Sequence, residues 1–275
     1  MRKVVYTIAC FLIASVSTAQ EQNNNKKTSR EEKKAAKKER IAEMLRREEE
    51  GEPIYRKHSA FGIKLNNDGY GLSYEIGKIK SAYKATIFQI ELNEKKHAKE
   101  EKQSTTNSVG GIIFLGNPFV YGKQNTFYQL KLGVGQQYMI GGKGNKNGVA
   151  VYSILAGGFS AGLQRPYYVE VEEPPQSGKS VFVKYTQQDS ALFLGPGILG
   201  GAGFGKGWNE IKFVPGLHAK AALRFDFGRF NTTVTAIEAG FNFEYYTSKI
   251  VQMVNVEGKN FFANGYLTVI FGKRK

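Results

Sequence analysis

Residues 212–227, KFVPGLHAKAALRFDF, decide the fold class of this 275-residue chain. One side-chain register is almost entirely apolar, and it holds Phe213, Leu217, Ala219, Ala221, Leu223, Phe225 and Phe227. The other register is polar, and it holds Lys212, His218, Lys220, Arg224 and Asp226. Successive side chains of a β-strand point to opposite faces of the sheet, so this period of two predicts a strand with one apolar and one charged face. Pro215 has no amide hydrogen to donate, so we expect the fully paired part of the strand to follow it.

Seven other segments are predicted strands, of which six show the same alternation, and an Asn67-Asp68-Gly69 hairpin signal separates the first two. They lie at about 59–66, 70–77, 82–92, 126–137, 149–163, 235–245 and 261–271. Both faces of 149–163 are small or apolar, so its register stays unassigned, and the short apolar run 109–116 has no assigned place. The pattern predicts eight antiparallel strands.

The connections between these strands alternate in length. Short ones are expected at 78–80, 138–148 and 228–232, whereas long ones are expected at 93–125, 164–210 and 248–259. Bacterial outer-membrane barrels have short turns on the periplasmic side and long loops outside. A soluble sandwich has no reason to sort its connections in this way. The sequence therefore predicts an all-β fold, an antiparallel transmembrane β-barrel of about eight strands over residues 58–275.

The polar register predicts what fills such a barrel. Five bases stand against five acids, and His218 and Asn242 join them; the charged set is Lys64, Lys131, Lys212, Lys220 and Arg224 with Glu75, Glu91, Asp226, Glu238 and Glu244. Buried charges are tolerated when they are paired, so balanced signs favour a salt-bridged lumen over the solvated face of a soluble sheet. Side chains can fill an eight-stranded barrel, so free diffusion of solutes, and hence a porin, is disfavoured.

The N-terminus predicts export. Residues 1–19 combine a basic start, an apolar run and small residues before Gln20, which is typical of a signal peptide. We therefore expect the protein in the cell outer membrane. Cys10 lies inside the apolar run; lipidation of Cys10 is the alternative to simple burial, but too few apolar residues precede it. Without the signal peptide the chain has no cysteine and so no disulfide.

Residues 20–57 form a separate, charged segment that predicts a periplasmic helix at about 30–49, with Ser29 and Glu32 at capping-box spacing. One interpretation is a solvated helix or spacer held by charge pairs. The other is a docking element, in which residues 26–50 contact a periplasmic protein or the cell wall. The contact patch would then consist of Ile41, Met44 and Leu45.

No motif in the sequence predicts catalysis, a metal or a cofactor. His58 and His97 lack partners at metal-ligand spacing. His218 could activate Ser160 only if their strands met, so we expect His218 to join the polar lumen and the protein not to be an enzyme. The net charge of +15 is spread over helix, loops and tail without a stacking platform, so no nucleic-acid partner is expected. Basic loop residues such as Lys95, Lys96, Lys99 and Lys102 suit anionic lipid head groups or phosphorylated lipid sugars.

Four stretches carry a family resemblance: LNNDGYGLSYEIGK (65–78), FVYGKQNTFYQLKLGVGQQ (119–137), RPYYVEV (165–171) and YLTVIFGKRK (266–275). Together with the signal peptide they resemble the small outer-membrane β-barrel proteins of Bacteroidota over residues 58–275. The resemblance implies contact with outer-membrane lipid and with the barrel-assembly machinery. It also implies that Tyr266 and Phe271 belong to the assembly signal, although a Lys-Arg-Lys extension follows Phe271 where the family pattern ends on an aromatic residue.

Two functions remain open at this stage. The first is a structural or interaction protein, a closed outer-membrane barrel with external loops and a periplasmic helix, accessory to secretion or envelope assembly. The second is a narrow transporter or ligand receptor in which the 164–210 loop gates the lumen. Channel conductance separates the two, because only an open lumen passes a steady current.

Overall fold

A computed structural model describes the protein at residues 32–36, 38–39, 42, 55–81, 83–109, 112–143, 148–174, 178–228 and 233–275. The chain divides into two units, 1–54 and 55–275. In the first unit the described residues are helical, and all lie within the helix predicted at 30–49. The predicted signal peptide and the predicted patch of Ile41, Met44 and Leu45 lie outside the described residues.

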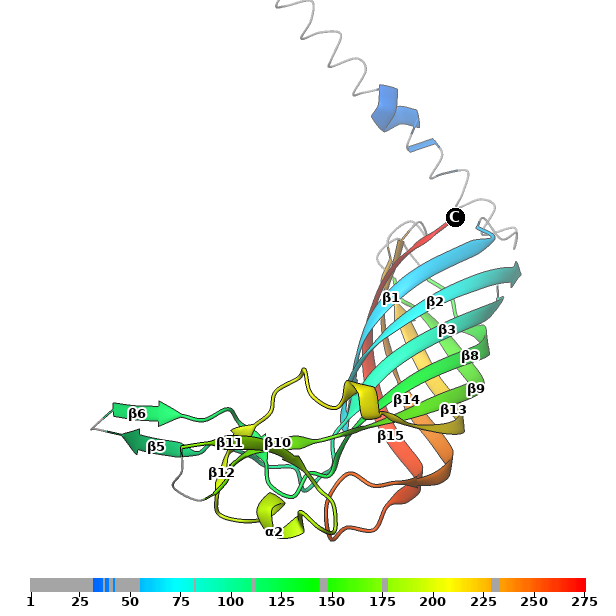
Figure 1. Ribbon diagram of the computed structural model, residues 1–275. Coiled ribbons are helices and arrows are strands. Elements are labelled where there is room, and N and C mark those ends of the chain that lie inside the picture. Colours follow the sequence, from blue (N-terminus) through cyan, green and yellow to red (C-terminus); the bar gives the residue numbers. More distant parts are fainter. Residues whose placement is uncertain are drawn as a thin grey trace, which may run out of the picture. The chain divides into compact units, whose positions relative to one another are not determined.

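The second unit contains a closed antiparallel β-barrel of eight strands (Figure 1). Their order round the ring is β1-β15-β14-β13-β9-β8-β3-β2, and β1 closes on β15 from His58 opposite Arg274 to Asn66 opposite Tyr266. The predicted barrel is thereby confirmed. The strands are β1 (Lys57–Asn66), β2 (Gly69–Ser81), β3 (Lys84–Lys95), β8 (Asn125–Gly141), β9 (Ala150–Pro166), β13 (Lys212–Asp226), β14 (Thr233–Ile250) and β15 (Lys259–Arg274).

Two details of the strands bear on the predictions. The turn predicted at 78–80 is wrong, because β2 runs on to Ser81 and Ile79 pairs with Ala85 of β3. Pro215 lies inside β13, but the pairing of β13 with β14 begins only at Gly216. The missing amide of Pro215 therefore removes no hydrogen bond from the β13–β14 ladder.

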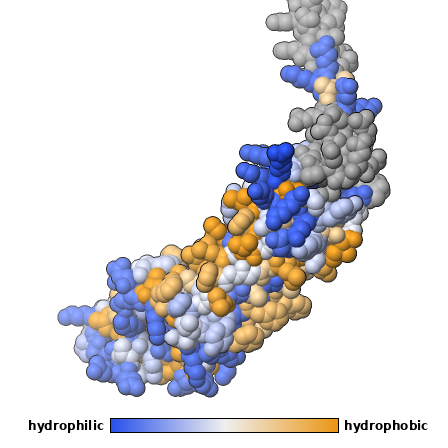
Figure 2. All heavy atoms as spheres, turned by 90° about the vertical axis from the view of Figure 1, so that its right-hand side faces the viewer, coloured by the Kyte–Doolittle hydropathy of each residue, from blue (hydrophilic) through white to orange (hydrophobic). Residues whose placement is uncertain are grey.

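Large apolar side chains cover the outside of the barrel. In the seven strands whose register was predicted, they come from the apolar register, and Figure 2 shows the resulting hydrophobic surface over the barrel. The structure also assigns β9, whose register the sequence left open: Leu155 and Phe159 point outward, whereas Ile154 and Ser160 are buried inside. A soluble sheet would bury this face, so its exposure over the described strands is typical of a membrane barrel.

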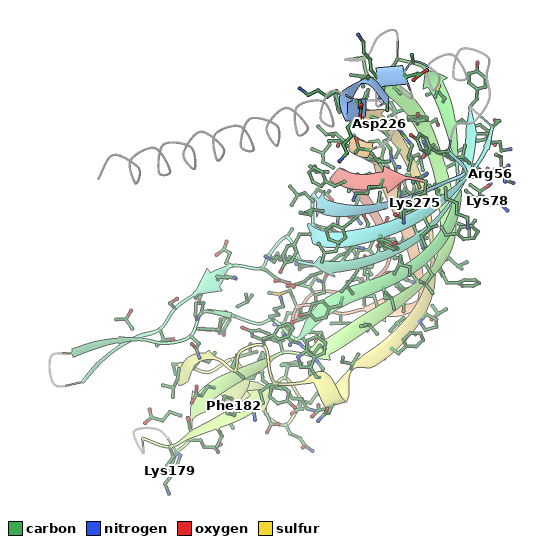
Figure 3. The ribbon with its side chains drawn as sticks, turned by 90° about the horizontal axis from the view of Figure 1, so that it is seen from above. Arg56, Lys78, Lys179, Phe182, Asp226 and Lys275 are labelled. Carbon is green, nitrogen blue, oxygen red and sulfur yellow. The ribbon has the colours of Figure 1, made fainter. Side chains whose placement is uncertain are left out.

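The barrel has two different ends. At the terminal end, where β1 begins and β15 finishes, the strands are joined across 82–83, 142–149 and 227–232. The loop end carries the Asn67-Asp68 turn, the two long connections 96–124 and 167–211, and the connection 251–258, which is as long as 142–149. Seen from above, Arg56, Lys78, Asp226 and Lys275 gather at the terminal end, away from Lys179 and Phe182 (Figure 3).

The long connections at the loop end contain secondary structure of their own, which the sequence analysis did not predict. Three strands of the connection 167–211 form a sheet in the order β11-β10-β12, and residues of 96–124 pair as β4 with β7 and β5 with β6. Such short strands give too little periodicity to be recognised before their partners are known. The elements are β4 (Lys102–Gln103), β5 (Thr106–Val109), β6 (Ile112–Leu115), β7 (Phe119–Val120), β10 (Tyr168–Glu172), β11 (Ser180–Lys184), α2 (Ser190–Phe193), β12 (Ile198–Gly201) and the 3-10 helix η1 (Trp208–Glu210).

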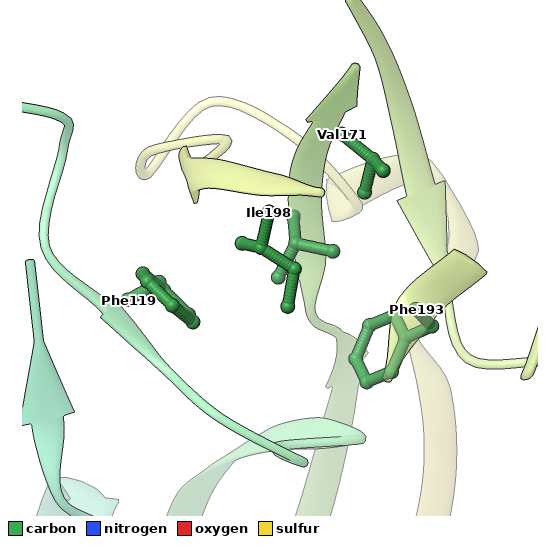
Figure 4. Packing of buried hydrophobic residues seen from close by; sticks show 5 residues of the cluster. Phe119, Val171, Phe193 and Ile198 are labelled. Atoms are coloured by element: carbon green, nitrogen blue, oxygen red, sulfur yellow. The ribbon is translucent and has the colours of Figure 1, made fainter. Parts of the chain in front are cut away.

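We call these elements at the loop end the lobe. The lobe has a hydrophobic core of its own, the lobe core. It consists of Phe119, Val169, Val171, Phe193 and Ile198, all buried (Figure 4). Tyr121 ties β7 to α2 through a hydrogen bond from its hydroxyl to the Leu194 carbonyl. The lobe therefore holds itself together by apolar packing outside the barrel wall.

Candidate functional site

The inner face of the barrel is the part of the molecule with the densest chemistry. Alternation places one register of each strand inside, and charged side chains from β1, β2, β3, β8, β13 and β14 meet there. All ten charged residues predicted for the lumen except Lys212 are buried. Asn242 is buried as well, opposite Lys220 in the β13–β14 pairing.

Arg224 is the centre of the first ionic cluster. Its guanidinium donates two hydrogen bonds to Glu75, of 2.5 Å and 2.6 Å, and two to Glu238, of 2.9 Å and 2.6 Å. Glu75 also accepts from the amide of Gln89 at 3.0 Å and lies 3.3 Å from His58 Nε2. The planar fork of arginine suits this paired recognition of carboxylates.

The same cluster continues toward the loop end through lysines. Lys220 Nζ lies 3.3 Å from both Glu238 Oε1 and Glu91 Oε1, and Lys64 Nζ donates to Glu91 Oε2 at 2.8 Å. Tyr266 completes the arrangement, because its hydroxyl donates to Glu238 at 2.6 Å and its ring lies 3.9 Å from Lys64 Nζ. Each charge therefore has an opposite charge within hydrogen-bonding distance, which offsets the cost of burying it.

Glu244 is the centre of a second cluster, nearer the loop end. It pairs with Lys131 and, at 3.0 Å, with Lys95, and Gln129 donates to its Oε2 at 2.6 Å. Lys95 also donates to Asp68 of the β1–β2 turn at 3.0 Å. This cluster ties the lumen to the turn above it.

Several of these pairs cross the full width of the lumen. Arg224 on β13 and Glu75 on β2 come from strands four places apart in the ring of eight, which is the largest possible separation. Lys95 on β3 and Glu244 on β14 are also four places apart. Charged side chains that reach opposite walls occupy the space through which a solute would pass.

Two lysines do not lie where the sequence predicted. Lys212, predicted inside, is exposed at the first position of β13, beyond the end of the barrel wall formed with β14. Lys95, predicted in an external basic loop, is 1% exposed within the lumen. A signal for Lys95 was present, since it continues the inward register of Gln89, Glu91 and Asn93, but the polar sequence around it suggested a loop.

The terminal end of the lumen is closed by different groups. Asp226 binds Arg274 there and accepts a hydrogen bond from the Gly228 amide at 2.7 Å. Next to them is an apolar cluster of Ala60, Val234, Ala236 and Ile270. The cavity at this mouth measures about 50 Å³, room for a few water molecules.

An aromatic layer lies at the loop end of the lumen. Phe127 packs against Tyr246 and Phe262 with ring centroids 5.5 Å and 5.6 Å apart, and Val214 and Ile250 are buried with them. Lys95 Nζ of the Glu244 cluster lies 5.2 Å from the Phe262 ring centroid, so the aromatic layer packs against this cluster at the loop end of the lumen. Such an arrangement is suited to a rigid plug and not to a passage.

His218 and Ser160 do meet in the structure, on the neighbouring strands β13 and β9. Ser160 Oγ and His218 Nδ1 are 3.1 Å apart, and the other edge of the imidazole packs against Gly133, where a methyl group would come within 2.9 Å of Nε2. A nucleophile and its base need a third group that orients the base. No hydrogen bond among the described residues joins His218 to a carboxylate, so the pair is placed as one more polar contact of the lumen.

The remaining predicted residues lie in β15. Phe271 is exposed on the outer face, and Tyr266 is buried in the lumen, as their opposite registers require. Within the described part of the chain, His, Cys, Asp and Glu side chains form no group of three that could hold a metal ion. A helix long and apolar enough to cross a bilayer is likewise not found there.

Comparisons with known proteins return likenesses of fold. The N-terminal β-barrel domain of Pseudomonas aeruginosa OprF is 8% identical, with a TM-score of 0.34 over 79% of this chain and 98% of that one. Neisserial surface protein A is 8% identical, with a TM-score of 0.37 over 80% and 96%. A major outer membrane protein from Thermus thermophilus is 10% identical, with a TM-score of 0.33 over 78% and 96%. Neither a family profile nor a curated protein matches this chain.

Proposed function

We propose that the protein is a closed outer-membrane β-barrel that acts as a structural or interaction protein. The observation that carries this proposal is the division of its two faces. Large apolar side chains cover the outside of an eight-stranded ring, while ion pairs such as Arg224–Glu75 join opposite walls inside it. An apolar outside suits lipid, and a cross-linked inside gives a stable body without a channel.

In this proposal the loop end, with its lobe, faces the exterior, and the terminal end faces the periplasm. Outer-membrane lipid surrounds the barrel, and the barrel-assembly machinery inserts it with Phe271 and Tyr266 in the assembly signal, as in the Bacteroidota barrels that the sequence resembles. The charged segment before β1 then extends into the periplasm. There, residues 26–50 would contact a protein or the cell wall, in a role accessory to secretion or envelope assembly.

The closed lumen is tested by recording from the purified protein in a planar lipid bilayer. We expect no steady current, because the Arg224 and Glu244 clusters obstruct the lumen. A purified open porin, recorded under the same conditions, is the positive control for detecting small conductances. Steady open currents from the wild type would reject the closed barrel and favour a narrow transporter or receptor gated by residues 164–210.

The interaction role is tested at the charged N-terminal segment. Cells carrying the wild type or a deletion of residues 26–50 are crosslinked, and the barrel is purified in mild detergent. We expect a periplasmic component to copurify with the wild type only, because the deletion removes the proposed contact while leaving the barrel complete. Identical copurification from both chains would rule out this segment as the contact.

A further inference from the structure

A cavity at the loop end is separate from the ionic lumen. It measures about 210 Å³ and lies between the β1–β2 turn, the start of the β3–β4 connection and the β14–β15 hairpin. Its lining includes Asp68, Lys96, His97, Met253, Lys259 and Phe261. The cavity thus combines an apolar wall with polar groups at its rim.

The charge at this cavity is positive and is not neutralised by carboxylates among the described residues. Its two acidic lining residues are paired elsewhere: Asp68 with Lys95, and Glu257 with Lys249. Lys96 and Lys259 are exposed, and none of the ion pairs between described residues includes either of them. Two ammonium groups are therefore free to bind an anion.

His97 adds a neutral donor to the same rim. Its Nδ1 accepts a hydrogen bond from the Lys99 amide at 3.2 Å, so a neutral ring carries its proton on Nε2. Burial and then the charge of Lys259 lower the pKa of His97 below its ordinary value, although Glu100 opposes them. Glu100 is itself bound by Lys123 at 2.6 Å, which leaves the rim positive overall.

The position of the cavity identifies the kind of ligand. Phe261 and Phe271 are the outermost aromatic residues on the apolar face of β15, and a transmembrane strand needs about 9–11 residues to cross a bilayer. Phe261 therefore lies where the apolar band ends, and Lys96, whose ammonium lies 5.3 Å from the Tyr70 ring centroid, lies at the same boundary. Tyrosine and lysine at that depth are typical of the lipid–water interface.

The volume of the cavity sets a limit on what enters it. Pockets that enclose whole drug-sized ligands measure about 300–1,000 Å³, so 210 Å³ accommodates one group of a larger molecule. An amphiphilic lipid fits both the position of the cavity at the lipid–water interface and its small volume. Its head group can occupy the cavity while its acyl chains lie against the outward face of β15.

We propose that this cavity binds the phosphorylated head group of an outer-leaflet lipid, with Lys96 and Lys259 as the anion-binding residues. The site rests on the proposed membrane location, since it requires lipid beside Phe261. It adds to that location a stoichiometric lipid contact, which would fix the height and the rotation of the barrel in the membrane.

The test measures lipid retained by the full-length protein in dodecyl maltoside, using native mass spectrometry. The probes are diphosphorylated lipid A, its dephosphorylated form and inorganic phosphate. The variants are the double substitution Lys96→Gln, Lys259→Gln and the charge-matched control Lys78→Gln, Lys80→Gln, which changes two exposed lysines of β2 at the terminal end of the barrel, away from the cavity. Ala98→Trp fills the cavity without changing its charge.

We expect one diphosphorylated lipid per wild-type barrel, at least about tenfold weaker retention by the double variant and by Ala98→Trp, and wild-type retention by the control. Equal retention by the double variant and the wild type would overturn the proposal, as would equal losses in both lysine pairs, or binding of inorganic phosphate without lipid. Folding of each variant is checked by heat-dependent mobility on gels, and outer-membrane fractionation tests the location separately. Normal fractionation with no lipid retained rejects the site alone.

Discussion

At the scale of single residues, Arg224 links the carboxylates of the polar interior across the barrel. It is 2% exposed and joins carboxylates from two strands, one of them on the opposite wall. A buried arginine would be costly alone, because its charge is removed from water. Here the carboxylates of Glu75 and Glu238 compensate the positive charge of Arg224. The free-energy cost of burial therefore appears only when either the arginine or the carboxylates are removed.

The first prediction concerns this imbalance. Arg224→Met should lower the free energy of unfolding by about 3–5 kcal/mol, since it leaves Glu75 and Glu238 buried with too little positive charge. The measurement is equilibrium urea unfolding in lipid vesicles. The matched control is Lys212→Met on the same strand and in the same register, where an exposed side chain should change stability by less than about 0.5 kcal/mol. Equal losses would mean that burial of the charge is not what matters.

At the scale of elements, each barrel strand has one face toward the outside of the barrel and one face toward the lumen. In β15, Leu267 lies on the outer face between Tyr266 and Thr268, both of which are buried inside. The strands are held in this orientation by ladders on both sides, as in the pairing of β15 with β1 and β14. A slip of one residue would turn charged groups toward the outside, so the register is strongly specified.

The second prediction compares two equally exposed positions on the outer face. Leu267 is 56% exposed near the middle of the apolar band, and Tyr245, paired with Phe261, is 55% exposed at its edge. Leu267→Arg should cost about 2–4 kcal/mol in vesicles, and Tyr245→Arg about 0–1 kcal/mol, because the cost of charge depends on depth in the bilayer. Unfolding titrations of the two variants give the comparison. A similar cost at both positions would contradict a membrane-spanning outer face.

At the scale of the whole molecule, the ring and the lobe are held by different interactions. Each of the eight strands pairs with two neighbours inside the ring, so the barrel needs no edge protection from the lobe. The lobe core, in turn, draws its buried residues from β7, β10, α2 and β12 and from none of the barrel strands. The lobe can therefore diverge or bind partners without altering the barrel.

The third prediction is that the barrel folds without the lobe. Replacing residues 168–208 by a short glycine-serine turn should preserve the heat-dependent gel mobility of a folded barrel. Val171→Asp in the intact chain is the companion variant: it places a charge in the lobe core and should make only the loop-end connections sensitive to protease. Loss of the mobility shift in either variant would show that the barrel depends on the lobe.

Much of this architecture can be read from alternation alone. The barrel is predicted by seven segments with period two, one further apolar segment at 149–163 and the alternating lengths of the expected connections. The polar register of balanced charge predicts most of the charged residues of the lumen. These features are local, because a strand exposes alternate residues to two faces whatever its partners are. The apolar register of Leu217 to Phe227 and the charged register of Lys220 to Asp226 follow directly from it.

The partners of the buried charges required the closed ring. Arg224 and Glu75 are 149 residues apart, and they meet only because ring closure places β13 opposite β2. The two wrong predictions, Lys212 inside and Lys95 in a loop, have the same origin. Both lysines continue an inward register, but the position at which a strand leaves the barrel depends on how far the neighbouring strands extend. The alternation of the sequence specifies whether a side chain points into the lumen or outward. The tilt of the strands, the stagger of their register and the closure of the barrel specify which side chains meet, because these features bring residues of distant strands to the same height along the barrel axis.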